Sequence, residues 1–139
     1  MMVDFKKEAK FQAIMPIGMV VIGLLAVMVL PNFLRKAVDS RRKETETFIV
    51  MLSTALEAYK MDVGDYPSTE QGLQALRIKP EGAARWDGPY LHKDVPPDPW
   101  NHPYIYRFPG KTPGKPEIIS YGADGKPGGQ GENADIVSE

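Results

Sequence analysis

A glycine-rich stretch near the C-terminus carries the residues that are best suited to bind a metal ion. Asp124 and Asp135 supply carboxylate oxygens, and the glycines between them let backbone carbonyls turn inward, a combination that suits calcium. The spacing of the two aspartates matches positions 1 and 12 of an EF-hand loop, with Gly129 at position 6. Lys126 and Gly128, however, stand at positions 3 and 5, which need side-chain oxygens, so we exclude an EF-hand. These residues alone leave two alternatives: a calcium loop of another kind, or an Asp-Gly turn followed by a solvated tail.

The rest of the sequence gives little support for other chemistry. The chain has no cysteine, which excludes thiol catalysis and disulfides, and its two histidines are too few for an imidazole-rich metal site. His102, between Asn101 and Pro103, is expected to be a turn residue. We find no nucleophile–base pair, phosphate loop or paired-carboxylate motif, and we predict that the protein is not an enzyme. A net charge of −1 gives no reason to expect nucleic-acid binding.

The elements that must position the glycine-rich stretch begin with a membrane-type helix. After a polar leader at residues 1–12, an unbroken run of eighteen apolar residues extends from Ala13 to Leu30, which is long enough to span a bilayer. We assign residues 13–34 to a transmembrane or filament-core helix. Lysines and arginines flank the run on both sides, so their count does not settle its orientation. A cleaved signal peptide is the alternative, but the run ends in Val29-Leu30-Pro31 rather than in the small residues of a cleavage site.

Residues 35–62 continue as an amphipathic helix. Apolar and small residues recur at intervals of three and four, as one face of a helix requires; they are Ala37, Val38, Thr45, Phe48, Ile49, Leu52, Ala55, Leu56 and Tyr59. The charged residues of the opposite face, between Arg41 and Glu57, are expected to be solvated and to form i,i+4 pairs, or to set the register between packed copies. A single helix over about residues 13–61 is too long for the small domain to cover, so its first half needs lipid or other helices.

Residues 63–139 form a small domain that is rich in glycine and proline. Ser68 begins a capping box, which predicts a short helix through about Arg77. Residues 104–107 and 117–120 are predicted to be strands of an antiparallel hairpin, and everything after Ser120 is predicted to be loop. Aromatic residues are interleaved with the turns, and we expect Trp100 to cover the core rather than to stack on a ligand.

Three stretches of this domain together resemble a known family. They read YPSTEQGLQAL at residues 66–76, DPWNHPY at residues 98–104, and SYGADGKPGG with a later ADI between residues 120 and 136. They occur in this order behind an apolar helix that ends in Pro31-Asn32. In this combination, and over roughly residues 19–136, the chain resembles the major pseudopilins of type II secretion systems.

The resemblance implies an α+β, type IV pilin-like fold, with a long N-terminal helix packed on a small antiparallel sheet and a C-terminal calcium-type loop. It further implies a structural subunit that sits in the inner membrane by a single span, with its C-terminal domain in the periplasm. Such subunits assemble with copies of themselves into a helical pseudopilus that drives protein export. The other partners that the resemblance implies are minor pseudopilins and the inner-membrane secretion platform.

The resemblance also selects between the two interpretations of the glycine-rich stretch. It implies Ca²⁺ bound by aspartate side chains and main-chain oxygens. Asp124 matches the family's first aspartate ligand. Asp135 and Asn133 are the candidates for the second half of the shell, and Tyr121 is expected to offer its carbonyl.

The N-terminus departs from the family pattern. The family begins its mature chain after a glycine, with phenylalanine first and glutamate fifth. Alignment on Pro31-Asn32 places Ala9, Lys10 and Ile14 at these three positions. We therefore do not predict the family's N-terminal cleavage and methylation, and no residue is evident for the glutamate's role of neutralising a neighbour's N-terminal amine.

Two other functions are kept as alternatives. The first is a monomeric, membrane-anchored periplasmic binding module with exposed aromatics as its ligand face. The second is a related type IV pilin, although the absence of a cysteine pair argues against an adhesive pilin with a disulfide-closed loop. Cross-linking along the apolar helix distinguishes a filament subunit from the binding module.

Overall fold

The computed structural model describes residues 5–138, with side chains described from Ile17 onward. These residues form a long helix, two short 3-10 helices and a three-stranded sheet. The chain divides into two compact units, residues 1–39 and residues 40–139, and each is described by itself. The predictions for Ala9, Lys10 and Ile14 concern side chains that lie outside the described ones.

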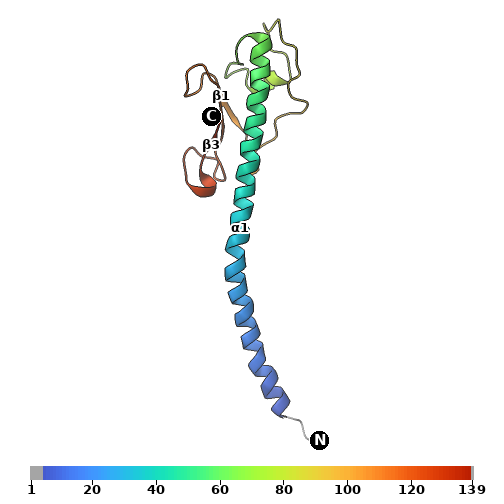
Figure 1. Ribbon diagram of the computed structural model, residues 1–139, viewed down its shortest axis with the longest axis vertical. Helices are drawn as coiled ribbons and strands as arrows, with labels where there is room; N and C mark the ends of the chain where they lie inside the picture. Colours follow the sequence, from blue (N-terminus) through green and yellow to red (C-terminus); the bar gives the residue numbers. More distant parts are fainter. Residues whose placement is uncertain (1–4, 139) are drawn as a thin grey trace. The chain divides into compact units, whose positions relative to one another are not determined.

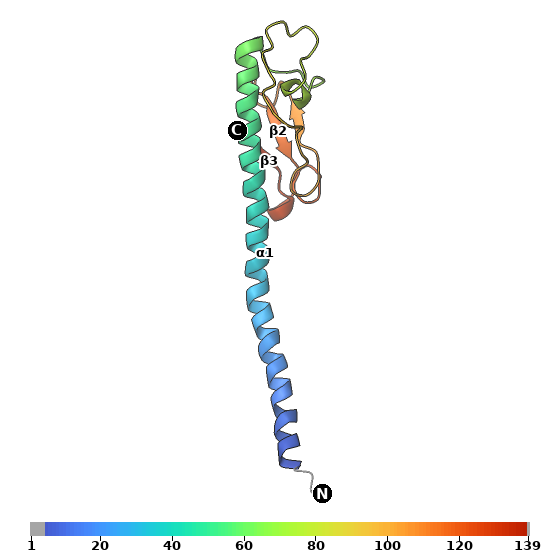
Figure 2. The same ribbon diagram turned by 90° about the vertical axis from the view of Figure 1, so that its right-hand side faces the viewer.

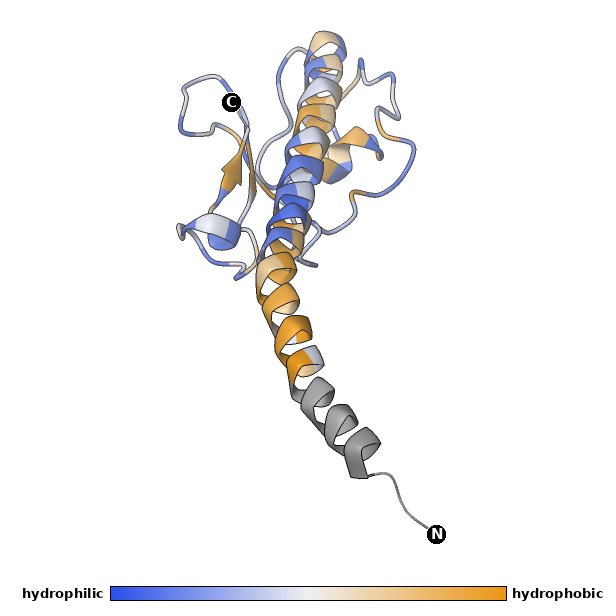
Figure 3. Cartoon of the chain, turned by 60° about the horizontal axis from the view of Figure 1, so that its bottom comes forward, coloured by the Kyte–Doolittle hydropathy of each residue, from blue (hydrophilic) through white to orange (hydrophobic). Residues whose placement is uncertain are grey.

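Helix α1 runs from Phe5 to Val63 and begins within the predicted leader (Figure 1). In the first unit, every described side chain from residue 17 to residue 36 is exposed, although most of those up to residue 34 are apolar (Figure 3). In the described part of the chain, this is the one helix that is long and apolar enough to cross a membrane. The first unit therefore leaves its apolar surface for lipid or for another protein.

In the second unit, α1 turns the predicted face toward the core. Thr45, Ile49, Leu52, Leu56 and Tyr59 are buried, which confirms the intervals of three and four. Helix α1 ends at Val63, where the amide of the following residue still donates to the Lys60 carbonyl at 2.8 Å. The opposite face is solvated, and its predicted i,i+4 pairing is found between Arg42 and Glu46 at 3.1 Å. Helical spacing alone thus predicted which side of this segment faces the domain.

The sheet lies beside this part of α1 (Figure 2). Its strands are β1 (Ile105–Arg107), β2 (Glu117–Ser120) and β3 (Ile136–Val137), in the order β1-β2-β3 and antiparallel throughout. The hairpin of β1 and β2 confirms the prediction for residues 104–107 and 117–120. All four residues of β2 are buried, and the core side chains that the sheet contributes are Tyr106, Ile118 and Ile136. The central strand therefore joins the hydrophobic core on α1 to the segment that follows it.

The prediction that everything after Ser120 is loop was wrong. The 3-10 helix η2 (Gly131–Asn133) and strand β3 lie in this segment. Strand β3 has only two residues, too few for an alternating pattern to be visible, yet Ile136 is buried and pairs with Ser120. Tertiary burial of one isoleucine, rather than local propensity, fixes this strand.

The predicted helix from Ser68 to Arg77 was only partly right. The capping box is present, because the Ser68 amide donates to Gln71 Oε1 at 2.9 Å and the Gln71 amide donates to Ser68 Oγ at 3.1 Å. The regular element is only the 3-10 helix η1, Leu73–Leu76. Gly72 has φ 60° and ψ −170°, which a helix does not allow, so the turn at Ser68 cannot continue as an α-helix.

Candidate metal centre

The glycine-rich stretch is closed into a loop by the sheet. Ser120 at the end of β2 pairs with Ile136 at the start of β3. The residues next to this pair inside the loop are Tyr121 and Asp135, two of the four predicted metal-site residues. Pairing of the strands therefore brings these two residues to the same end of the loop.

Backbone carbonyls from the second half of the loop face glycines in the first half. A Cβ on Gly122 would lie 2.7 Å from the carbonyl oxygen of Glu132, and one on Gly129 would lie 2.5 Å from that of Asn133. Both glycines also have positive φ, 66° and 93°. Only glycine allows so close an approach, and main-chain oxygens are of the kind that calcium binds.

Asp135 has the side chain that is best placed to bind a cation. Its Oδ2 accepts a hydrogen bond from the Gly128 amide at 2.9 Å, which fixes the side chain across the loop. Its Oδ1 is buried and has no hydrogen-bond partner in the part of the chain that the structure describes. An ionised oxygen in that position is costly unless something compensates its charge. A cation would supply that compensation, so Asp135 fits the role of a calcium ligand.

The other three predicted residues are less closely joined to Asp135. Asp124 is exposed, and its Oδ1 accepts from the Lys126 amide at 3.1 Å, as in an Asp-Gly turn. The Tyr121 hydroxyl accepts from Arg107 Nη2 at 3.1 Å, which leaves the carbonyl as its oxygen for the loop. Asn133 presents its carbonyl, not its side-chain amide, to Gly129. No described hydrogen bond links Asp124 to Asp135.

A metal ion here would depend on main-chain oxygens. The described residues contain no group of three or more histidine, cysteine, aspartate or glutamate side chains placed to hold a metal. Sequence reasoning named the carbonyl of Tyr121 but did not indicate that the carbonyls of Glu132 and Ala134 face Gly122. Their direction follows from closure by β3, which the sequence pattern did not reveal.

A buried carboxylate supports the loop from the DPWNHPY turn. The side chain of Asp98 is inaccessible to solvent and accepts hydrogen bonds from the Trp100 and His102 amides at 3.1 and 2.9 Å. It also accepts from the Ser120 hydroxyl at 2.6 Å, at the end of β2. Asp98 thus ties the turn to the strand from which the loop begins. The Asp-Pro start of the turn was the available signal, since aspartate commonly accepts from amides two residues on.

The ring of His102 contacts the loop directly. His102 lies in the turn, as predicted, but its Nδ1 is 3.0 Å from the Gly122 carbonyl oxygen. A Cβ on Gly125 would lie 3.0 Å from His102 Nε2, so the loop packs closely over the ring. The prediction placed the residue correctly and missed this contact.

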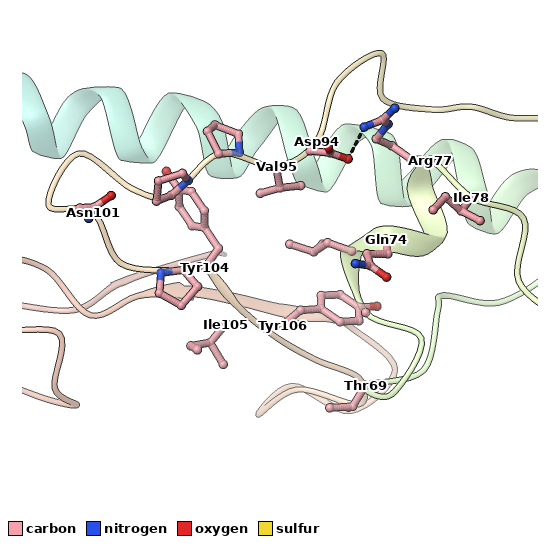
Figure 4. Close-up of a pocket in the computed structure, with 15 residues that line it drawn as sticks. Thr69, Gln74, Arg77, Ile78, Asp94, Val95, Asn101, Tyr104, Ile105 and Tyr106 are labelled. Atoms are coloured by element: carbon pink, nitrogen blue, oxygen red, sulfur yellow. Dashed lines mark hydrogen bonds and ion pairs between the residues drawn. The ribbon is translucent and has the colours of Figure 1, made fainter.

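A separate groove of about 700 Å³ lies along β1 (Figure 4). It is lined by residues that include Tyr104, Ile105 and Tyr106, and by the ion pair of Arg77 and Asp94. None of the four predicted metal-site residues lines it.

Comparisons with known proteins agree with the fold and with the sequence motifs. The family model described as type II secretion system (T2SS), protein G matches residues 32–139. The type II secretion system core protein G of Vibrio cholerae serotype O1 is 42% identical over 120 residues, which cover 84% of this chain and 81% of the relative. The protein of the same name from Pseudomonas aeruginosa is 40% identical over 120 residues, 84% of each chain.

A solved structure shows the same fold. The crystal structure of the major pseudopilin from the type 2 secretion system of enterohaemorrhagic Escherichia coli aligns with a TM-score of 0.60 and 34% sequence identity. The alignment covers 73% of this chain and 85% of that one. The α+β prediction of a long helix with a small antiparallel sheet is therefore confirmed. The chain belongs to the protein G family of the type II secretion system, the family of the major pseudopilins.

Proposed function

We propose that this protein is the structural subunit of a periplasmic pseudopilus, in which copies stack helically and drive protein export by a type II secretion system. The observation that carries the proposal, beside family membership, is the apolar surface of residues 17–34. Most of its side chains are more than half exposed. So much contiguous apolar surface is not left to water, and it calls for lipid before assembly and for neighbouring helices afterwards.

The binding-module alternative receives no support from the aromatic residues. Tyr59, Tyr66 and Tyr106 are buried in the core, and Trp86, Tyr90, Trp100, Tyr104 and Phe108 pack against it. Trp100 therefore covers the core, as predicted. These rings contribute to the stability of the core, and of them only Tyr104 and Tyr106 line the groove along β1.

Assembly is tested by disulfide cross-linking, for which the cysteine-free chain is well suited. Each subunit needs two cysteines, because a single one yields only dimers. We would pair Met19→Cys with a cysteine at Val27, Leu30 or Leu34 in cells that express the secretion system. We expect ladders of covalent oligomers for at least one pair. Cysteines at the exposed Lys111 and Lys115 are the matched control and should give no ladder. Monomers alone from every helix pair would refute the filament and favour the binding module.

The proposed role also implies a location and a set of partners. A single span in the inner membrane, with residues 63–139 in the periplasm, places the domain where a pseudopilus grows. The proposed partners are other copies of the chain, the minor pseudopilins and the inner-membrane secretion platform. The apolar helix of the first unit supports membrane anchoring by its length and composition.

We further propose that the loop between β2 and β3 holds Ca²⁺. Asp135 and Asp124 would supply carboxylate oxygens, and Tyr121 and Asn133 would supply main-chain oxygens. The buried Oδ1 of Asp135, which has no partner in the described part of the chain, and the carbonyls that face Gly122 and Gly129 support this assignment. The ion would supply positive charge that holds these oxygens together, in a small domain that has no disulfide to do so.

A further inference from the structure

Glu132 connects the loop to two other parts of the second unit. It lies at the centre of η2, and its Oε1 accepts hydrogen bonds from Arg41 Nη1 at 3.2 Å and from Trp100 Nε1 at 3.1 Å. Arg41 is on α1, whereas Trp100 is in the turn that Asp98 organises. In the described residues, the contact with Arg41 is the one hydrogen bond or ion pair between α1 and the loop.

The backbone of the same residue forms part of the loop wall. The Glu132 carbonyl accepts from the Ala123 amide at 3.0 Å and faces Gly122. The next carbonyl, that of Asn133, faces Gly129, and Asp135 follows two residues later. The contacts of the Glu132 side chain therefore restrain the same short segment of main chain that presents the proposed calcium ligands.

The loop has few other means of holding its shape. Between residues 121 and 135, Gly122 is the one buried residue, so no apolar side chain anchors the segment in the core. Glycine-rich backbone loses much conformational freedom when it is ordered, and a ligand that binds the ordered form must supply that free energy. A contact that orders the loop beforehand consequently raises the affinity for the ligand.

We propose that Glu132 is a positioning residue for the calcium site, which holds the loop in its binding form and connects occupancy of the site to Arg41 and Trp100. The inference rests on the proposed calcium function and deepens it. By thermodynamic reciprocity, if the two contacts favour calcium binding, calcium binding must favour the two contacts. The first turns of α1 in the second unit then respond to calcium although they hold none of its proposed ligands.

Calorimetric calcium titration of the full chain in detergent tests the proposal. Glu132→Ala should lower calcium affinity about threefold to tenfold, the range expected for loss of a half-exposed, charge-assisted contact. Arg41→Gln should have a smaller effect in the same direction. The double variant should lose little more calcium affinity than Glu132→Ala, because the two substitutions remove the same interaction. Glu132→Gln keeps an acceptor for Trp100 and should fall between the wild type and the alanine variant.

A matched control and a second readout separate positioning from general stability. Glu46→Gln removes the exposed pair with Arg42 on the same helix and should leave calcium affinity unchanged. The indole N–H resonance of Trp100 should shift on calcium addition in the wild type, and this response should be lost in Glu132→Ala. A general loss of stability would not remove that response selectively.

The outcomes distinguish the proposed role of Glu132 from the proposed calcium site on which it rests. A wild-type chain that binds no calcium overturns the calcium site and the role of Glu132 together. A wild type that binds calcium, with the same affinity in Glu132→Ala and Arg41→Gln, overturns the role of Glu132 alone.

Discussion

At the scale of single residues, the two oxygens of Asp135 have different environments. One is held by the Gly128 amide, and the other is buried and has no partner among the described residues. The contact with Gly128 positions the side chain, whereas burial of the second oxygen is costly unless a positive charge compensates it. Asp124, by contrast, is exposed and bound only within its own turn. Asp135 is therefore the residue on which calcium dependence should rest most heavily.

Asp135→Asn should abolish the stabilisation of the domain by calcium. For the wild type, calcium at about a hundredfold above Kd should raise Tm by about 10 °C or more over a chelator-treated sample. The variant should melt at one temperature in both conditions, because the amide keeps the size of the side chain and removes its charge. Asp124→Ala should lower Tm and also lose the calcium response. Glu81→Gln, an exposed change outside the loop, is the control. Equal melting of the wild type with calcium and with chelator would contradict the calcium site.

Buried tyrosines predict a loss of stability at high pH. Burial, together with the hydrogen bond to Glu57 and the charge of that carboxylate, raises the pKa of Tyr66 to about 12. Burial and nearby carboxylates likewise raise the pKa of Tyr104 to about 12. A raised pKa means that folding favours the neutral phenol, so its stabilisation is present below the unfolded pKa of 10 and is lost as pH rises toward 12. We expect chemical denaturation to show a steady fall in stability from pH 10 to 12.

Tyrosinate absorbance checks the origin of this effect. Native titration should show late-ionising tyrosines, and Tyr66→Phe should remove one of them. If all tyrosines of the folded chain ionised near pH 10, the assignment of raised pKa values would be wrong.

The metal-site residues show what a sequence can and cannot predict at this scale. Asp124, Asp135 and the glycines between them could be named as candidates because residues of these types suit calcium. The carbonyls of Glu132 and Ala134 could not, since every residue has a carbonyl and only the folded loop decides where it points. The contact of His102 with Gly122 was invisible for the same reason.

At the scale of elements, helices and strands with long sequence patterns were predicted better than those with short ones. The face of α1 repeats over several turns, so helical spacing identified its buried residues correctly. The β1–β2 hairpin was also predicted, because two apolar runs flank a segment rich in turn residues. Strand β3 and helix η2 are two and three residues long and depend on contacts that only the closed loop provides. Short elements of this kind were the ones that the prediction missed.

The buried face of α1 predicts which substitutions destabilise the domain. Leu56 is fully buried, and Leu56→Ala should lower the free energy of unfolding by about 2–5 kcal/mol through lost burial and a cavity. Val50 lies on the same helix but is 65% exposed, and Val50→Ala should change stability by less than about 0.5 kcal/mol. Denaturant unfolding monitored by circular dichroism measures both. Comparable effects of the two changes would show that α1 does not pack as described.

At the scale of the whole molecule, the two units differ in what they bury. The second unit has a hydrophobic core of its own, built from α1, η1 and the sheet. The first unit exposes its apolar side chains from residue 17 to residue 34. Family membership and fold could thus be predicted from the sequence, whereas the division of stability between the units required the structure.

A shortened chain that begins at Arg35 should therefore remain folded and dissolve without detergent. We expect it to be monomeric by sedimentation and to keep the calcium-dependent Tm of the full chain, because the core and the loop both lie in the second unit. The full chain should need detergent or lipid to stay in solution. Aggregation or loss of helical signal in the shortened chain would show that the second unit depends on the first.

The small size of the outer strands has a consequence for a protein that works as many stacked copies. Strands β1 and β3 form the two edges of the sheet and have three and two residues. Beyond β1, the Phe108 amide already donates to the Thr69 hydroxyl at 3.0 Å. An edge this short offers too few free amides and carbonyls to template pairing with another chain. The short edges therefore disfavour strand pairing between crowded subunits.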